Sequence, residues 1–253
     1  MKLKHLSFLL MAAMSAPMVA QAAEESPHSV SANVGLTSNY VFRGISQTGG
    51  DPAIQGGLDY AHSSGFYLGA WASNVGWIED FQGYASGNME IDVYGGYSNS
   101  FKDISYDVGA ITYRYPGSRA GAVPGDTNEI YASLGWKWFT VKYSYYLSDN
   151  VFGFANADGS DYVDISASLP VGETGLTLGA HWGSFTFDNN GNQDYDDWKV
   201  SVDYDMGKMN KLFDGMSFGV AYTDTNAKKA FWTDVNGEDL GDGTFIVSIS
   251  KSF

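Results

Sequence analysis

Along most of the chain, apolar residues alternate with small or polar ones in a two-residue repeat. Ionisable side chains recur at the positions between the apolar residues. Charged groups on such a face can line a water-filled space, where they pair with one another or attract a solute of opposite charge. Carboxylates outnumber bases among them, which favours cations or neutral solutes over anions. The candidate lining residues are Arg43, Asp59, Glu90, Asp92, Asp107, Glu129, Lys142, Asp164, His181, Lys199 and Asp203, and Asn39, Gln55 and Lys137 share their phase.

Each inward charge has a structural and a functional interpretation. Arg43 with Asp59, or Lys142 with Glu129, could form ion pairs that brace or plug the interior rather than conduct. In the functional interpretation, Arg43 lies inside a pore near its outer rim and influences which ions pass.

Catalytic and metal-binding patterns are weak in this sequence. His181 suggests a Ser–His esterase, but the chain has no G-x-S-x-G nucleophile motif. The loops Asn156–Asp161, Asp188–Asp194 and Asp234–Asp242 are rich in Asp, Asn and Gly, but none follows the EF-hand order of a calcium loop. We therefore expect no catalytic residue, no metal site and no cofactor.

The elements that position these residues are predicted to be β-strands. Val30, Ala32, Val34 and Leu36 alternate with small or polar residues, a period of two that indicates a strand with one apolar face. About twelve such segments follow one another up to Phe245–Ile249. In the third, Tyr67 and Trp71 interrupt the pattern and leave its phase open.

The connections between these segments alternate in length. They are mostly short after the even-numbered segments, as at Ser63-Ser64 and Lys137-Trp138, and mostly long and polar after the odd-numbered ones, as from Pro116 to Thr127. An up-and-down barrel has short periplasmic turns and longer extracellular loops, whereas a Greek-key sandwich has no reason for this alternation. The prediction is all-β: one antiparallel up-and-down transmembrane β-barrel of about 12 strands.

Aromatic residues support lipid as the outer solvent. A water-soluble sandwich would spread its aromatics along the strands, whereas here they collect near strand ends, as in the two interfacial girdles of membrane barrels. The residues concerned are Tyr40, Phe42, Tyr60, Tyr97, Trp136, Trp138, Phe139, Tyr145, Trp182, Tyr204 and Tyr222.

The first residues have the pattern of an export signal. Lys2 and Lys4 precede an apolar run and the cleavage motif Ala20-Gln21-Ala22, so residues 1–22 are predicted to be a cleaved signal peptide and 23–253 the barrel. Loss of Lys2 and Lys4 leaves 12 of the 14 basic residues against 29 acidic ones, so the formal charge falls from −15 to −17. This charge argues against a nucleic-acid partner. The chain has no cysteine, so it does not depend on disulfides.

Residues Ile246–Phe253 alternate and finish on a terminal Phe. This ending resembles the C-terminal strand signature of bacterial outer-membrane barrels, and it implies delivery to the barrel insertion machinery through Phe253.

Four stretches resemble the TorF-like family of proteobacterial outer-membrane porins. They are Thr37–Thr48 (TSNYVFRGISQT), Pro52–Tyr60 (PAIQGGLDY), Gly65–Val75 (GFYLGAWASNV) and Glu90–Tyr97 (EIDVYGGY). The similarity is dense over the first third of the chain and general afterwards. It implies a pore-forming barrel of the outer membrane, and it carries over no agreed substrate and no catalytic residue.

These observations predict an outer-membrane porin in a Gram-negative bacterium. It would pass small hydrophilic solutes by diffusion through a narrow, charge-lined lumen, in contact with outer-membrane lipid and lipopolysaccharide. Two alternatives remain: a non-conducting barrel that acts through its loops as an adhesin, receptor or membrane stabiliser, and a lipid-modifying enzyme. Single-channel conductance of the refolded chain separates the three.

Overall fold

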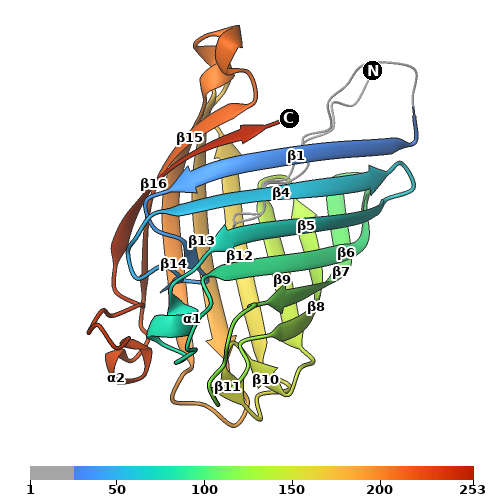
Figure 1. Cartoon of the computed structure of the whole chain (residues 1–253). Coiled ribbons are helices and arrows are strands. Elements are labelled where there is room, and N and C mark those ends of the chain that lie inside the picture. Colours follow the sequence, from blue (N-terminus) through green and yellow to red (C-terminus); the bar gives the residue numbers. More distant parts are fainter. Residues whose placement is uncertain (1–25) are drawn as a thin grey trace.

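The computed structural model describes residues 26–253, so the predicted signal peptide at residues 1–22 lies outside the described residues. Twelve strands form a closed antiparallel barrel (Figure 1). They are β1 (His28–Thr37), β4 (Ala53–His62), β5 (Phe66–Asn74), β6 (Met89–Phe101), β7 (Ile104–Arg114), β8 (Thr127–Trp136), β9 (Phe139–Tyr146), β12 (Asp161–Pro170), β13 (Leu176–Thr186), β14 (Tyr195–Asp205), β15 (Met216–Thr225) and β16 (Thr244–Ser252).

Every barrel strand pairs with its neighbours in the sequence, and β1 closes the ring by pairing with both β4 and β16. The register at the closure places Leu36 opposite Ile54 on one side and opposite Ile249 on the other. The ring therefore has no free edge, which is the condition for a sheet to survive in hydrocarbon, where unpaired backbone groups are costly. The predicted up-and-down barrel of twelve strands is confirmed.

Large apolar side chains cover the outside of the barrel. Val30 is 67% exposed, Leu134 62% and Val93 44%, and every barrel strand carries at least one exposed large apolar residue. The uncertain third segment is resolved, because Phe66 and Leu68 are exposed while Trp71 is buried. An apolar belt of this extent is favourable only against lipid. Among residues 26–253, no helix is long and apolar enough to cross a membrane.

The connections alternate as predicted. The short ones join β4 to β5, β6 to β7, β8 to β9 and β12 to β13, and the longest of this group, 206–215, contains the 3-10 helices η1 (Met206–Lys208) and η2 (Lys211–Phe213). The long ones carry β2 (Val41–Phe42), β3 (Ile45–Ser46), α1 (Trp77–Asp80), β10 (Asn150–Val151), β11 (Phe154–Ala155) and α2 (Lys229–Trp232). Figure 1 shows α1, α2 and β10–β11 gathered at one end of the barrel, which we call the mouth.

Glycines in the wall make room for inward-facing tyrosines. Gly69 lies opposite Tyr94 in the β5–β6 register, and a Cβ on Gly69 would fall 2.4 Å from the Tyr94 ring. Gly96 stands in the same relation to Tyr67, with 2.5 Å to its hydroxyl. Each ring therefore lies along the wall over a glycine instead of projecting across the lumen, which leaves the interior wider.

Gly96→Ala is expected to lower the free energy of unfolding by about 1–3 kcal/mol, the usual cost of overpacking. The new Cβ would meet the Val108 carbonyl oxygen, a backbone atom that cannot give way, at 2.4 Å. Urea unfolding of the refolded barrel, followed by tryptophan fluorescence, measures the change. The control is Gly191→Ala, whose Cβ would come no closer than 3.4 Å to the Asp194 carboxylate; equal stability of the two variants would contradict the close packing of Tyr67.

Candidate functional site

None of the eleven candidate lining residues is exposed, although all carry ionisable groups. Ten of them lie on barrel strands at positions whose neighbours in the sequence include exposed outward-facing residues. The eleventh, Arg43, lies in the connection between β1 and β4.

Of the other predicted inward residues, Asn39 is buried and Gln55 half-buried, but the expectation for Lys137 is wrong. Lys137 is exposed in the β8–β9 turn, with its ammonium 4.6 Å from the centre of the Trp136 ring, because the turn breaks the two-residue repeat.

The connection from β1 to β4 folds into a small hairpin formed by β2 and β3. Its turn is Arg43-Gly44, with φ of +48° and +80°. Positive φ at both central residues is the signature of the type I′ turn that two-residue hairpins prefer. A Cβ on Gly44 would lie 2.5 Å from both the Asp197 Cβ and the Thr225 Cγ2, so only glycine fits at the tip.

This β2–β3 hairpin crosses the lumen. It leaves the wall between β1 and β4, yet Arg43 reaches Glu129 on β8 and Ser144 on β9, and Gly44 touches Asp197 on β14 and Thr225 on β15. Its residues from Tyr40 to Thr48 are buried, apart from the half-buried Val41 and Phe42. The hairpin thus braces opposite parts of the wall and occupies part of the lumen.

Arg43 fastens the hairpin by charge and by ring contacts. Its Nη2 lies 2.9 Å from Glu129 Oε2 and 3.3 Å from Ser144 Oγ, and its guanidinium carbon lies 4.3 Å from the centre of the Tyr162 ring and 4.8 Å from that of Phe42. Burial by itself would lower the pKa of the guanidinium, but the Glu129 carboxylate outweighs that effect and holds the pKa above its usual value. Arg43 is therefore a fixed positive charge.

Of the two ion pairs expected from the sequence, one is confirmed. Lys142 Nζ lies 3.8 Å from Glu129 Oε1, as predicted. The pairing of Arg43 with Asp59 is wrong, because the hairpin carries Arg43 away from β4 to β8, and Asp59 instead accepts a hydrogen bond from the Tyr94 hydroxyl. Glu129 thus joins two bases and also accepts from the Tyr113 hydroxyl at 3.1 Å.

A second polar cluster surrounds His181 on the opposite part of the wall. One ring nitrogen contacts Asp164 and the other lies 2.6 Å from Asp197 Oδ1, while the Tyr162 hydroxyl donates to Asp197 at 2.9 Å. Both imidazole nitrogens therefore face carboxylates, an arrangement that suits an ion pair rather than a general base beside a serine. Lys199 lies opposite His181 in the β13–β14 register, and Ser201 donates to Asp203 at 3.2 Å.

Tyrosine hydroxyls donate hydrogen bonds to most of the other inward-facing carboxylates. Tyr67 donates to Asp107 at 2.8 Å and lies 2.5 Å from the Tyr131 hydroxyl, while Tyr40 donates to Glu90 at 2.7 Å. The lining is therefore a network in which few groups point freely into solvent.

The sequence analysis missed Asp197, Ser144 and the inward tyrosines. Asp197 has the parity of Lys199 and Asp203 on the same strand, and Ser144 has that of Lys142, so parity alone could have identified both. The tyrosines have no such signal, since aromatic residues also populate the outward phase.

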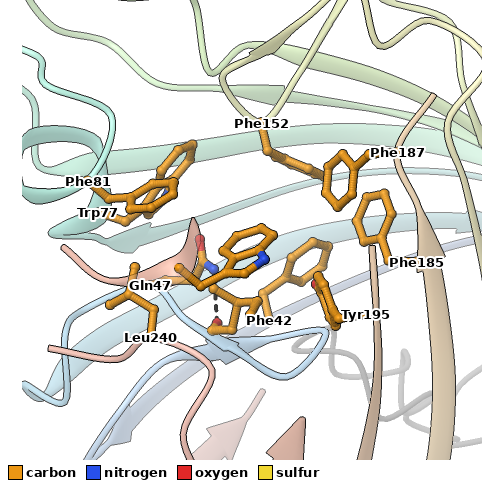
Figure 2. Close-up of a pocket in the computed structure, with 11 residues that line it drawn as sticks. Phe42, Gln47, Trp77, Phe81, Phe152, Phe185, Phe187, Tyr195 and Leu240 are labelled. Atoms are coloured by element: carbon orange, nitrogen blue, oxygen red, sulfur yellow. Dashed lines mark hydrogen bonds between the residues drawn. The ribbon is translucent and has the colours of Figure 1, made fainter. Parts of the chain in front are cut away.

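Aromatic side chains from the long connections fill the mouth. Figure 2 shows Phe42, Trp77, Phe81, Phe152 and Tyr195 converging from the β2–β3 hairpin, the α1 loop, the β10–β11 loop and β14. The cavity that remains among them is about 30 Å³, room for only one or two water molecules. Tyr40 and Phe42, which we predicted in an interfacial girdle, belong to this mouth core, because their segment folds inward.

Charge is distributed unevenly between the two ends. The six long connections hold twelve acidic and four basic residues, whereas the five short ones hold three acidic and four basic residues. The mouth is therefore the more acidic end, and the lumen beside it is also rich in carboxylates. No group of three or more His, Asp or Glu suited to a metal occurs within residues 26–253.

Solved porin structures share this fold. The chain aligns with the NanC porin at a TM-score of 0.56 and 12% identity, covering 88% of this chain and 99% of that one. It aligns with the KdgM porin at 0.51 and 10% identity, covering 88% and 98%, and with the KdgM porin in complex with disordered oligogalacturonate at 0.53 and 11% identity, with the same coverage. At these identities the likeness establishes the fold alone.

Comparison with curated proteins finds no match. The model of the family described as "Bacterial protein of unknown function (Gcw_chp)" matches residues 21–253. The closed barrel, its apolar outer belt and its porin-like fold place the protein in the bacterial outer membrane. The chain therefore belongs to the Gcw_chp family, of which it is an outer-membrane β-barrel member.

Proposed function

We propose that the protein is an outer-membrane porin through which small hydrophilic solutes diffuse passively. The observation that carries this proposal is the inner face of the closed barrel, where ten ionisable residues point away from the lipid side and Arg43 joins them from the β2–β3 hairpin. An interior that served only as a core would be apolar, since buried charges are costly unless they face water or a partner. The proposal gives these residues the role of pore lining, with the β2–β3 hairpin as the constriction.

The sign of the lining suggests the solutes. Eight carboxylates face the lumen from the strands, against Lys142, Lys199, His181 and the hairpin's Arg43. Such a field favours cations and neutral solutes over anions. The KdgM structure holds oligogalacturonate, a polyanion; by this argument a polyanion would be a poor solute for this chain.

In planar bilayers, the refolded chain is expected to give conductance steps of defined size and to prefer K⁺ over Cl⁻ several-fold. The preference follows from the excess of carboxylates along the path, and salt should weaken it by screening. The reversal potential under a KCl gradient measures it. A preference for Cl⁻ would refute the charge argument, and the absence of any step from a barrel with an intact β-sheet spectrum would refute the porin.

The mouth core favours a second candidate, a non-conducting barrel whose loops act as a receptor, adhesin or membrane stabiliser. The loops pack on one another around a cavity of only about 30 Å³, as expected of loops that form a rigid binding surface. Electrical silence in the same bilayer experiment supports this candidate. A lipid-modifying activity has no comparable support, because both nitrogens of His181 face carboxylates.

The remaining partners follow from the same proposal. Outer-membrane lipid and lipopolysaccharide would contact the apolar belt. Phe253 directly follows β16, and its backbone exchanges two hydrogen bonds with Ala32. Its side chain is exposed, so the barrel insertion machinery could bind it. The first third of the chain resembles TorF-like porins, and this resemblance supports the proposed function.

A further inference from the structure

Three carboxylates lie close together beneath the β2–β3 hairpin. Glu90 and Asp92 on β6 are each 2% exposed, and Glu129 on β8 is 1% exposed. Glu129 is paired with Arg43 and Lys142, and Glu90 accepts from the Tyr40 hydroxyl. Asp92 differs, because its Oδ1 is fully buried and accepts no hydrogen bond within the described part of the chain.

The charges of this cluster do not balance. Three carboxylates share two bases, and both bases are held by Glu129. Glu90 lies two residues from Asp92 on the same buried face of β6 and provides it with no counter-charge. A buried carboxylate without a counter-charge is strongly unfavourable when ionised, so a cation bound beside Asp92 would stabilise its ionised form.

The surroundings of Asp92 indicate which kind of cation would fit. Trp71 on β5 and Tyr113 on β7 lie directly opposite Asp92 in the two registers, and both are buried on the same inward face. Directly opposed residues have Cβ atoms about 4.5–5.5 Å apart, so the two aromatic side chains flank the carboxylate. Aromatic rings beside an anion suit a primary ammonium group, whose N–H groups donate to the carboxylate while its charge lies beside the rings. A divalent metal would need more oxygen ligands than this site offers.

We propose that the lumen binds a small monovalent ammonium-type cation at Asp92, between Trp71 and Tyr113 and below the β2–β3 hairpin. The inference rests on the proposed function, because the cation reaches this position through the lumen. It deepens that function by naming a primary amine as the class of solute that the constriction selects.

Isothermal titration calorimetry of the purified, detergent-refolded barrel with methylammonium chloride tests the site. We expect saturable binding that Asp92→Asn weakens at least tenfold, because this nearly isosteric change removes the counter-charge. Asp103→Asn is the matched control: it removes the same charge from an exposed β6–β7 turn and should bind as the parent does. A second readout is thermal unfolding, in which methylammonium should raise the Tm of the parent and of Asp103→Asn but not that of Asp92→Asn.

The outcomes separate the site from the function. Absence of saturable binding by the unmodified barrel overturns the proposal even if Asp92→Asn fails to fold, and so does equal binding by Asp92→Asn. Conductance without methylammonium binding would support the porin proposal and overturn the cation site. Saturable, Asp92-dependent binding by an electrically silent barrel would support the cation site and overturn the porin proposal.

Discussion

Arg43→Ala is expected to lower the free energy of unfolding by about 3–5 kcal/mol, the usual cost of breaking a buried ion pair by removing one partner. The change leaves Glu129, whose side chain is fully buried, with Lys142 at 3.8 Å as its remaining basic partner, and it removes the guanidinium contacts with Phe42 and Tyr162. Because the same contacts hold the β2–β3 hairpin across the lumen, single-channel conductance should also rise several-fold. Urea unfolding in detergent and planar-bilayer recording measure the two effects.

The matched control removes both charges. Arg43→Met combined with Glu129→Gln removes the Glu129 carboxylate together with its guanidinium partner, so its stability should recover most of the loss seen in Arg43→Ala. Its conductance should stay high, because the Arg43 contacts that hold the β2–β3 hairpin across the lumen are still absent. If Arg43→Ala changed neither conductance nor ion selectivity, the assignment of the hairpin as the constriction would be wrong.

Val200→Arg is expected to destabilise the inserted barrel by about 2–4 kcal/mol, the cost of an arginine facing lipid near the bilayer midplane. Val200 lies at the centre of β14, outward and 48% exposed, with Ala180 and Tyr222 as its cross-strand partners. Guanidinium unfolding from lipid vesicles measures the loss.

The control for this change is Tyr204→Arg, which has the outward parity of Val200 but lies at the short-turn end of the same strand, where the cost falls to about 0–1 kcal/mol. Equal stability of the two arginine variants would mean that depth along β14 has no effect. The outer belt would then not be in hydrocarbon.

The barrel itself could be predicted from the sequence because a strand pattern is local. Alternation at Val30–Leu36 and its repeats fixes which side chains face outward, and the alternating connection lengths fix the up-and-down order. The Lys142–Glu129 pair followed from the same parity, since both residues lie on the inward face of neighbouring strands.

The β2–β3 hairpin across the lumen could not be predicted in this way. Strands β2 and β3 have two residues each, too few to show a period, and the tip of their hairpin is an Arg-Gly turn that lacks the usual Asn or Asp. Its partners on β8, β9, β14 and β15 are distant in the sequence, so only the three-dimensional structure reveals that Arg43 meets Glu129 rather than Asp59. The mouth core was missed for the same reason, since loops that pack on loops leave no periodic signal.

The pairing of β1 with β16 has a consequence for biogenesis. Thr37 on β1 lies opposite Ser248 on β16 in the register, so the ring is joined by residues separated by almost the whole described chain. Contacts of such long range carry a large loop-closure entropy and form slowly. The polypeptide cannot complete its hydrogen-bonded cylinder until its last strand has been delivered, and until then it carries two unsatisfied strand edges. Its transit to the membrane is therefore a period of vulnerability to aggregation, during which holding chaperones would be most needed.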